Sequence, residues 1–269
     1  MFCKPFKLML YILFSIAIVT GCALSPQRSA MVTMPTDEIW DLVVIGDSSI
    51  DRIGEAFASQ IENDVGVMVV VEDYVADGLR IGDVISVLQH KGAFRDELRD
   101  LPTDLADADV VVMFIGNPIG SIISENPWNM DGCGHVSALP KNCNPAALEK
   151  YITDLKWIWG EIFRLRNGQQ TILRTMDMYN PIVNIWNEKD IFLECTRCLE
   201  NHSNAIRLAA EAYHIPFISR YDVYNGVNHD EDSRERGYIR SVGFHVSNLG
   251  IQVLIEMLAQ LGYEPVPPP

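Results

Sequence analysis

The chain has 269 residues, 48% of them hydrophobic and 21% charged, which is ordinary globular composition and excludes collagen-like, coiled-coil and wholly disordered proteins. The 36 acidic residues outnumber the 21 basic ones, and the formal net charge is -15. Because binding to a phosphate backbone depends on basic side chains, we expect no nucleic acid partner. We interpret the acidity as a solvated surface.

The N-terminal segment has the residue order of an export signal. Lys4 and Lys7 precede an apolar run over residues 8–19, and small residues follow it. That run, of about 12 residues, is shorter than the roughly 20 that span a bilayer, so a permanent transmembrane helix is the weaker alternative. We therefore expect residues 1–21 to be a signal peptide.

The stretch Val19-Thr20-Gly21-Cys22 resembles a bacterial lipobox, in which cleavage before the cysteine leaves that residue N-terminal and lipid-modified. On this interpretation Cys22 anchors the protein to the membrane surface without spanning it. Residues 22–37, rich in Ser, Pro, Thr and Met, then form a flexible tether. We expect an exported lipoprotein of the cell surface or periplasm. The alternative is an ordinary cleaved signal and a secreted protein.

From residue 38 onward, short apolar runs alternate with amphipathic patterns. The expected strands are residues 41–45, 67–71, 110–115, 171–176 and 215–219. The expected helices are residues 50–61, 81–88, 146–165, 195–213 and 248–261. This alternation predicts a three-layer α/β/α sandwich around a five-stranded parallel sheet. The domain is expected over residues 38–264, with a Pro-rich tail at 265–269.

Four cysteines lie within this domain, in two close pairs. An exported protein can form disulfides, and we predict that Cys133 pairs with Cys143 and that Cys195 pairs with Cys198. The C-x-x-C spacing of the second pair also suits a redox or metal site. Since the sequence has no second pair of that spacing and His202 is the only nearby imidazole, we expect a structural disulfide and no metal.

Candidate site residues follow several of the expected strands. In open parallel sheets, ligands bind beyond the carboxyl ends of the strands, where loops and helix N-termini converge. Ser48 follows the first strand, Gly78 the second and Asn117 the third, and His245 precedes the last helix. A serine alcohol needs an imidazole to take its proton and N–H donors for the developing oxyanion. Ser48 and His245 fit the nucleophile and the base. The N–H groups of Ser48 and Gly78 and the amide of Asn117 fit the oxyanion hole.

These residues carry a resemblance to a known superfamily. Val43-Val44-Ile45-Gly46-Asp47-Ser48-Ser49 resembles the first block of the SGNH, or GDSL, hydrolases, and Gly78 and Asn117 match the second and third blocks. Residues 243–250 resemble the final block, which contains the catalytic His. The resemblance covers residues 38–261. It implies a flavodoxin-like hydrolase fold, esterase, lipase or acetylesterase chemistry, and no metal or organic cofactor.

The chain departs from the family pattern in its final and third blocks. The usual Asp three residues before the His is Val242 here, and Val246 replaces a family Pro after the His. The third block reads Gly116-Asn117-Pro118, without its usual Asp. In a Ser-His-Asp triad the carboxylate holds the imidazole tautomer and stabilises the imidazolium. A backbone carbonyl near Ser241 or Val242, or an acid from residues 230–235, could accept from His245 Nδ1–H instead.

The sequence therefore predicts an exported serine hydrolase that cleaves carboxylic esters of acetylated carbohydrates or lipids. Ser48 forms the acyl-enzyme and His245 is the base. The alternative is a catalytically impaired protein of the same fold that binds a glycan or lipid at the cell surface. The inserted segments 121–144 and 179–194 carry Trp128, Tyr179 and Trp186, which we expect either to line the substrate pocket or to pack as lids.

Overall fold

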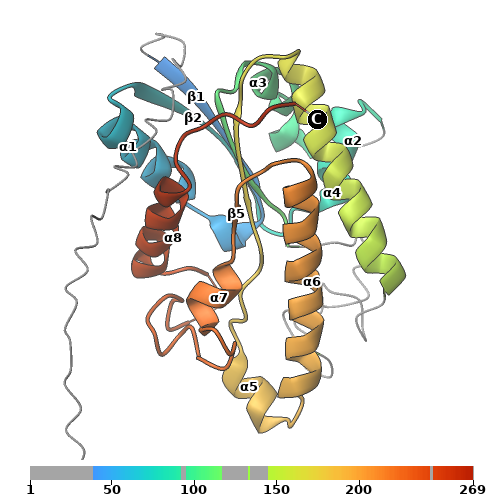
Figure 1. Cartoon of the computed structure of the whole chain (residues 1–269), viewed down its shortest axis with the longest axis vertical. Helices are drawn as coiled ribbons and strands as arrows, with labels where there is room; N and C mark the ends of the chain where they lie inside the picture. The colour runs from blue at the N-terminus through green and yellow to red at the C-terminus, as the bar shows by residue number, and fades with distance from the viewer. Residues whose placement is uncertain (1–38, 92–94, 117–132, 134–144, 243–244, 269) are drawn as a thin grey trace, which may run out of the picture. The chain divides into compact units, whose positions relative to one another are not determined.

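The computed structural model describes residues 39–91, 95–116, 133, 145–242 and 245–268. In this part of the chain, all strands are parallel and form one sheet in the order β2-β1-β3-β4-β5 (Figure 1). The strands are β1 (Ile39–Gly46), β2 (Met68–Val75), β3 (Val110–Phe114), β4 (Ile172–Met176) and β5 (Phe217–Ile218). The predicted five-stranded parallel sheet is confirmed.

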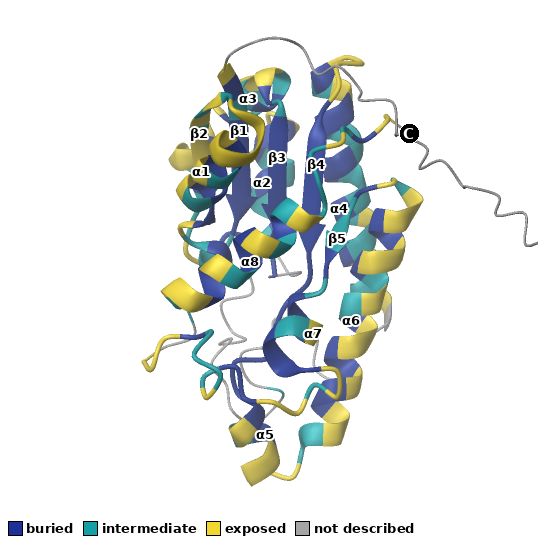
Figure 2. Ribbon diagram, turned by 60° about the vertical axis from the view of Figure 1, so that its left-hand side comes forward, coloured by how far each residue is buried: buried dark blue, intermediate teal, exposed yellow. Residues whose placement is uncertain are grey.

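Helices cover both faces of the sheet, as Figures 1 and 2 show. One face carries α1 (Ile53–Val65) and α8 (Asn248–Gln260), which pack against each other. The other face carries α2 (Ile81–Leu88), α3 (Leu101–Asp107), α4 (Pro145–Arg166) and α6 (Phe192–Ala212). Two short helices, α5 (Val183–Glu188) and α7 (Arg220–Asn225), lie beyond the carboxyl ends of the strands. The predicted three-layer arrangement is confirmed.

The position of each strand in the sheet explains its sequence. Every residue of β3 and β4 is buried, because helices pack on both faces. β3 is the continuous apolar run that such a position favours, whereas β4 also carries the buried polar residues Arg174 and Thr175. The edge strand β2 is largely exposed, and Met68 at its start is 56% exposed. Gly46 pairs with Val75 of β2 and with Phe114 of β3, so the carboxyl ends of these three strands are level with one another.

Three α-helices in the described ranges were not predicted from the sequence. They are α3, α5 and α7, of seven, six and six residues. Such short segments hold fewer than two helical turns, so they carry too little hydrophobic periodicity to be recognised. The first predicted helix also begins later than expected, at Ile53, because Ser48–Ile50 form a separate short 3-10 helix.

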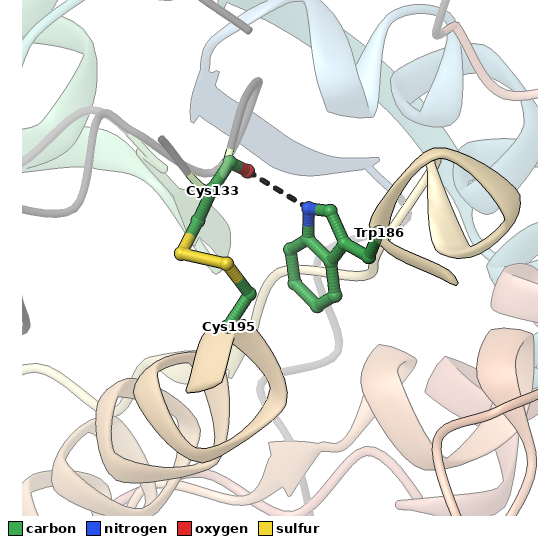
Figure 3. The surroundings of a disulfide bond; sticks show 3 residues. All are labelled: Cys133, Trp186 and Cys195. Carbon is green, nitrogen blue, oxygen red and sulfur yellow. Dashed lines mark hydrogen bonds between the residues drawn. A yellow bond between two sulfur atoms is a disulfide. The ribbon is translucent and has the colours of Figure 1, made fainter. Parts of the chain in front are cut away.

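The predicted cysteine pairing is wrong. Cys133 is disulfide-bonded to Cys195, 62 residues away in the sequence, and the indole Nε1 of Trp186 donates to the Cys133 carbonyl O at 3.1 Å (Figure 3). Cys198 is disulfide-bonded as well, and Cys143 lies outside the described residues. Both Cys195 and Cys198 lie in α6, and this helix presents Cys195 to a segment that is distant in sequence.

Several predicted features lie outside the described residues. They are the signal peptide and tether over residues 1–37, the anchor Cys22, the oxyanion candidate Asn117 and the aromatic Trp128. Among the helices of the described ranges, none combines the length and the apolar character that a membrane crossing requires.

Candidate active site

Ser48 begins the short 3-10 helix that directly follows β1. Asp47 fixes this turn with both carboxylate oxygens: Oδ1 accepts the N–H of Ser49 at 2.9 Å, and Oδ2 accepts the N–H of Gly116 at 2.6 Å. The N–H of Ile50 donates to the Asp47 carbonyl O at 3.1 Å. Asp47 thus links the turn after β1 to the end of β3, and Ser48 is placed at the carboxyl edge of the sheet.

The residue before this turn, Gly46, is closely packed against its neighbours. A Cβ atom on Gly46 would overlap the side chain of Ile50 and the carbonyl O of Phe114, so only glycine allows the strand end to approach them so closely. Ile50 is completely buried, whereas Ser48 is half-buried. The packing therefore anchors the turn through Ile50 and leaves Ser48 accessible.

His245 lies in a small antiparallel loop before α8. Ile239 pairs with Val246, and the N–H of Arg240 donates to the His245 carbonyl O at 3.0 Å. The imidazole Nδ1 lies 3.2 Å from the carbonyl O of Ser48. Because a carbonyl oxygen only accepts, this hydrogen bond requires a proton on Nδ1, and in the neutral ring Nε2 is then the free base.

The structure thus brings Ser48 and His245 together, but the group that orients the imidazole is not one of those expected. We predicted a carbonyl near Ser241 or Val242, or an acid from residues 230–235, and the carbonyl of Ser48 occupies that role instead. Within the described residues no carboxylate contacts the ring, and Ser48 Oγ and His245 Nε2 are not hydrogen-bonded to each other. The side chain of Val242 is exposed.

Gly78 lies in the turn after β2, in the left-handed region at a φ of 64°. This turn is adjacent to the Ser48 turn, because the N–H of Ala76 donates to the Gly46 carbonyl O at 3.0 Å. In the described part of the chain, neither the N–H of Ser48 nor that of Gly78 donates to a protein acceptor. The third predicted donor, Asn117, lies outside the described residues.

Arg52 connects the two halves of the site and was not predicted. Its Nη1 donates to Asn248 Oδ1 at 3.1 Å and its Nη2 to the Val246 carbonyl O at 3.5 Å, so it links the start of α1 to the segment that carries His245. A groove of about 670 Å³ between α1 and α8 includes both Arg52 and Asn248 in its lining. Arg52 could have been noticed in the sequence as an isolated basic residue shortly after Gly46-Asp47-Ser48, in a chain that is acidic overall.

Asp177 follows β4 and is completely buried. Its Oδ2 accepts the hydroxyls of Ser203 at 2.7 Å and Ser219 at 3.0 Å, and its Oδ1 accepts the N–H of Tyr221 at 3.1 Å. Burial raises the pKa of this carboxyl to about 6, although these hydrogen bonds and the nearby Arg220 act in the opposite direction. Inspection of the ends of β4 and β5, by the rule that identified Ser48, would have found Asp177 and Arg220.

Other predicted candidates belong to the interior. Tyr179 and Trp186 are buried, so they do not line an open pocket. His202 is buried in α6, where it stacks on Tyr151 with the ring centroids 4.9 Å apart, and burial lowers its pKa to about 3. In the described ranges, no group of three or more His, Cys, Asp or Glu residues is arranged to hold a metal ion.

Comparisons with known proteins bear on the fold. The sequence matches no family model and no curated protein. Among solved structures it is similar to the lipase Lip_vut3 from a goat rumen metagenome, with a TM-score of 0.58 and 18% identity over 84% of this chain and 98% of that one. It is also similar to a candidate SGNH hydrolase from Slackia heliotrinireducens, with a TM-score of 0.50 and 13% identity over 82% and 98% of the two chains. Such low identities establish the fold alone.

Proposed function

We propose that this chain, whose fold is that of the SGNH hydrolases, cleaves carboxylic esters through an acyl-enzyme on Ser48 with His245 as the general base. The observation that carries the proposal is the 3.2 Å contact between His245 Nδ1 and the Ser48 carbonyl O. This contact supports the proposal, because it requires a proton on Nδ1 and leaves Nε2 as the free base next to the residue that we propose as the nucleophile. We propose acetylated carbohydrates or lipid esters as substrates, and export with a lipid anchor at Cys22.

In the proposed mechanism, Ser48 Oγ attacks the ester carbonyl carbon while His245 Nε2 takes its proton. The negative oxygen of the tetrahedral intermediate accepts the N–H groups of Ser48 and Gly78, together with the Asn117 amide. His245 then returns the proton to the departing alcohol, which leaves the acyl group on Ser48. A water molecule gives its proton to Nε2 and attacks the acyl carbon, and Ser48 recovers its proton when the acid is released.

The hydroxyl of Ser48 must turn toward Nε2 before the first step, because the two atoms are not hydrogen-bonded in the free protein. The ring of His245 must turn as well, because Nδ1 and Nε2 point to nearly opposite sides of an imidazole and one serine cannot meet Nδ1 with its carbonyl and Nε2 with its hydroxyl at the same time. Catalytic hydrogen bonds commonly tighten only when substrate is bound. In the free protein the Ser48 carbonyl selects the tautomer of His245 that leaves Nε2 as the base. Among the described residues no carboxylate contacts the ring to stabilise the imidazolium, so we expect slower turnover than in a complete triad.

The test compares the purified wild-type protein with Ser48→Ala on p-nitrophenyl acetate and on p-nitrophenyl esters of longer acids. We expect the variant to lose essentially all activity and to escape labelling by a fluorophosphonate. Ser49→Ala is the matched control, because the buried Ser49 hydroxyl has no hydrogen-bond partner among the described residues and we expect its removal to leave the turn intact. Equal rates in the wild type and Ser48→Ala would remove Ser48 from the mechanism.

One observation favours a second candidate function. Within the described residues the imidazole of His245 contacts no carboxylate, as expected of a protein that has lost catalytic power and binds a glycan or lipid instead. Binding of an acetylated xylo-oligosaccharide in calorimetry, without fluorophosphonate labelling of Ser48 and without ester cleavage, would favour this alternative over the esterase.

A further inference from the structure

A buried arginine lies next to the turn that carries Ser48. Arg220, the first residue of α7, is 0% exposed. Its Nη1 donates to the Ser49 carbonyl O at 3.1 Å, and its Nε donates to the Asp177 carbonyl O at 2.6 Å. Its guanidinium carbon lies 4.1 Å from the centroid of the Phe114 ring. One side chain therefore joins the turn after β1 to the ends of β3 and β4.

This cation is costly to bury. Within the described residues Arg220 forms no salt bridge, and its Nη2 has no hydrogen-bond partner. Its charge is offset by carbonyl dipoles, by the rings of Phe114 and Tyr179, and by the carboxylate of Asp177, which lies near enough for Arg220 to lower its pKa against the effect of burial. Because apolar side chains often fill such a space at least as stably, stability alone does not account for an arginine here.

The two hydrogen bonds act on the backbone that presents the nucleophile. The Ser49 carbonyl belongs to the residue after Ser48, so its direction sets the path of the chain immediately beyond the nucleophile. The guanidinium is a rigid planar fork, and it holds the carbonyls of Ser49 and Asp177 in a fixed relation to each other. The Ser48 carbonyl, in the same turn, orients His245. A displacement of this turn would therefore move both reacting groups.

We propose that Arg220 is a positioning residue for the ester hydrolysis proposed above, on which this inference rests. Its fork holds the Ser48–Ser49 turn in the conformation that aligns Oγ and the Ser48 N–H with the substrate. Its positive charge also adds to the electrostatic environment that favours the negative oxygen of the tetrahedral intermediate. The role is distinct from substrate binding, so it affects the rate of the bound complex.

Arg174 in β4 provides a matched control. It too is 0% exposed, and its Nη2 donates to the carbonyl oxygens of Gly262 at 2.6 Å and Glu264 at 3.2 Å. Figure 1 shows the C-terminal segment that it holds at the opposite end of the sheet from α7. Replacing either arginine removes a buried cation and its bonds to backbone carbonyls, but only Arg220 contacts the Ser48 turn.

The experiment measures kcat and KM on p-nitrophenyl acetate for Met and Lys substitutions at both arginines, at a temperature where circular dichroism shows each variant folded. We expect Arg220→Met to lower kcat about 100-fold with KM changed less than about twofold, since small misplacements of reacting groups have effects of this size. Arg220→Lys keeps the charge but loses the fork, and we expect a loss of about tenfold. The Arg174 variants should lose thermal stability and keep their kcat.

Two other kinetic results would contradict the proposal. Equal kcat in the folded Arg220 and Arg174 variants would show that Arg220 is only structural, and a raised KM with unchanged kcat would show that it acts on substrate binding. If Arg220→Met does not fold, the kcat of Arg220→Lys and the rate at which a fluorophosphonate labels its Ser48 decide instead. A wild-type protein that neither cleaves esters nor reacts with the probe would overturn the proposed function, and this inference with it.

Discussion

The two sides of the candidate site are held in very different ways. On the Ser48 side, Asp47 binds two backbone N–H groups and Arg220 binds a backbone carbonyl, so the turn is fixed from several directions. On the His245 side, the ring has a single polar contact within the described residues, the Ser48 carbonyl at 3.2 Å. The nearby Val242 occupies the place of the usual acid and is 83% exposed.

If the proposed roles hold, the resting orientation of the base comes from a backbone carbonyl and not from a carboxylate. The firmly held part of the site is the Ser48 turn, and His245 takes its orientation in the free protein from the backbone of that turn. Disturbance of the Ser48 side should therefore reach His245, whereas changes in the His245 loop should leave Ser48 in place.

The largest effect is expected from a substitution that tests whether His245 is the general base. His245→Ala removes the proton acceptor of both chemical steps, and we expect kcat on p-nitrophenyl acetate to fall about 1,000-fold. The fluorophosphonate should label Ser48 more slowly by a similar factor. The melting temperature should stay near that of the wild type, because in the part of the chain that the structure describes the ring makes only one polar contact. Stopped-flow acylation and steady-state rates measure the effect.

His90→Asn is the control for that variant. His90 is exposed and has a left-handed backbone at a φ of 52°, a conformation that Asn tolerates. Its activity should match the wild type. A His245→Ala variant that keeps more than about a tenth of the wild-type kcat would mean that another group takes the proton, since a positioned base contributes at least about 100-fold.

A second prediction concerns the pH range over which the well-held side is stable. Burial raises the pKa of Asp177 from 3.8 to about 6, so in this interval the folded protein keeps a proton that the unfolded chain has lost. The Asp177 contribution to the free energy of unfolding therefore falls as the pH rises from 3.8 to about 6, by roughly 3 kcal/mol. Asp177→Asn removes this titration.

His202 acts in the opposite direction. Burial lowers the pKa of His202 from 6.5 to about 3. As the pH falls through this interval, the unfolded chain binds a proton at this residue and the folded protein does not. The free energy of unfolding therefore falls with the pH. In urea unfolding between pH 4 and 6, we expect Asp177→Asn to lose stability on acidification more steeply than the wild type, and His202→Phe to lose it less steeply. Parallel stability curves for either variant and the wild type would contradict these assignments.

The sequence predicts the well-held side better than the weakly held one. The strand before Ser48, its tight turn and the helix that follows are all local patterns, and β3 and β4 read as buried parallel strands because both of their faces are covered. The serine and the histidine could be identified from their residue types. The contact between them could not be predicted, because the carbonyl of Ser48 is a backbone group that no sequence pattern marks.

Long-range contacts of side chains were the main omission. Cys195 pairs with a cysteine 62 residues away, whereas the sequence favoured its neighbour in the same helix. Arg220 lies 171 residues from the carbonyl that it binds, and its helix is too short to show periodicity. Both errors have one cause: separation along the chain gives little information about separation in space once helices and strands have packed.

The smallest effect is expected from a substitution that places an acid at position 242, where the family usually has an Asp. It tests whether His245 can be held by a carboxylate in addition to the Ser48 carbonyl. Val242→Asp places a carboxylate three residues before His245, but the position is 83% exposed and Nδ1 already donates to the Ser48 carbonyl. An exposed ion pair contributes at most about 1 kcal/mol, so we expect kcat to rise less than about fivefold. Val227→Asp is the control, since Val227 is 85% exposed and the substitution adds the same charge. A rise of 100-fold or more in Val242→Asp alone would show that the loop turns this position toward the imidazole in the working enzyme, and that the base can then be held as firmly as the nucleophile.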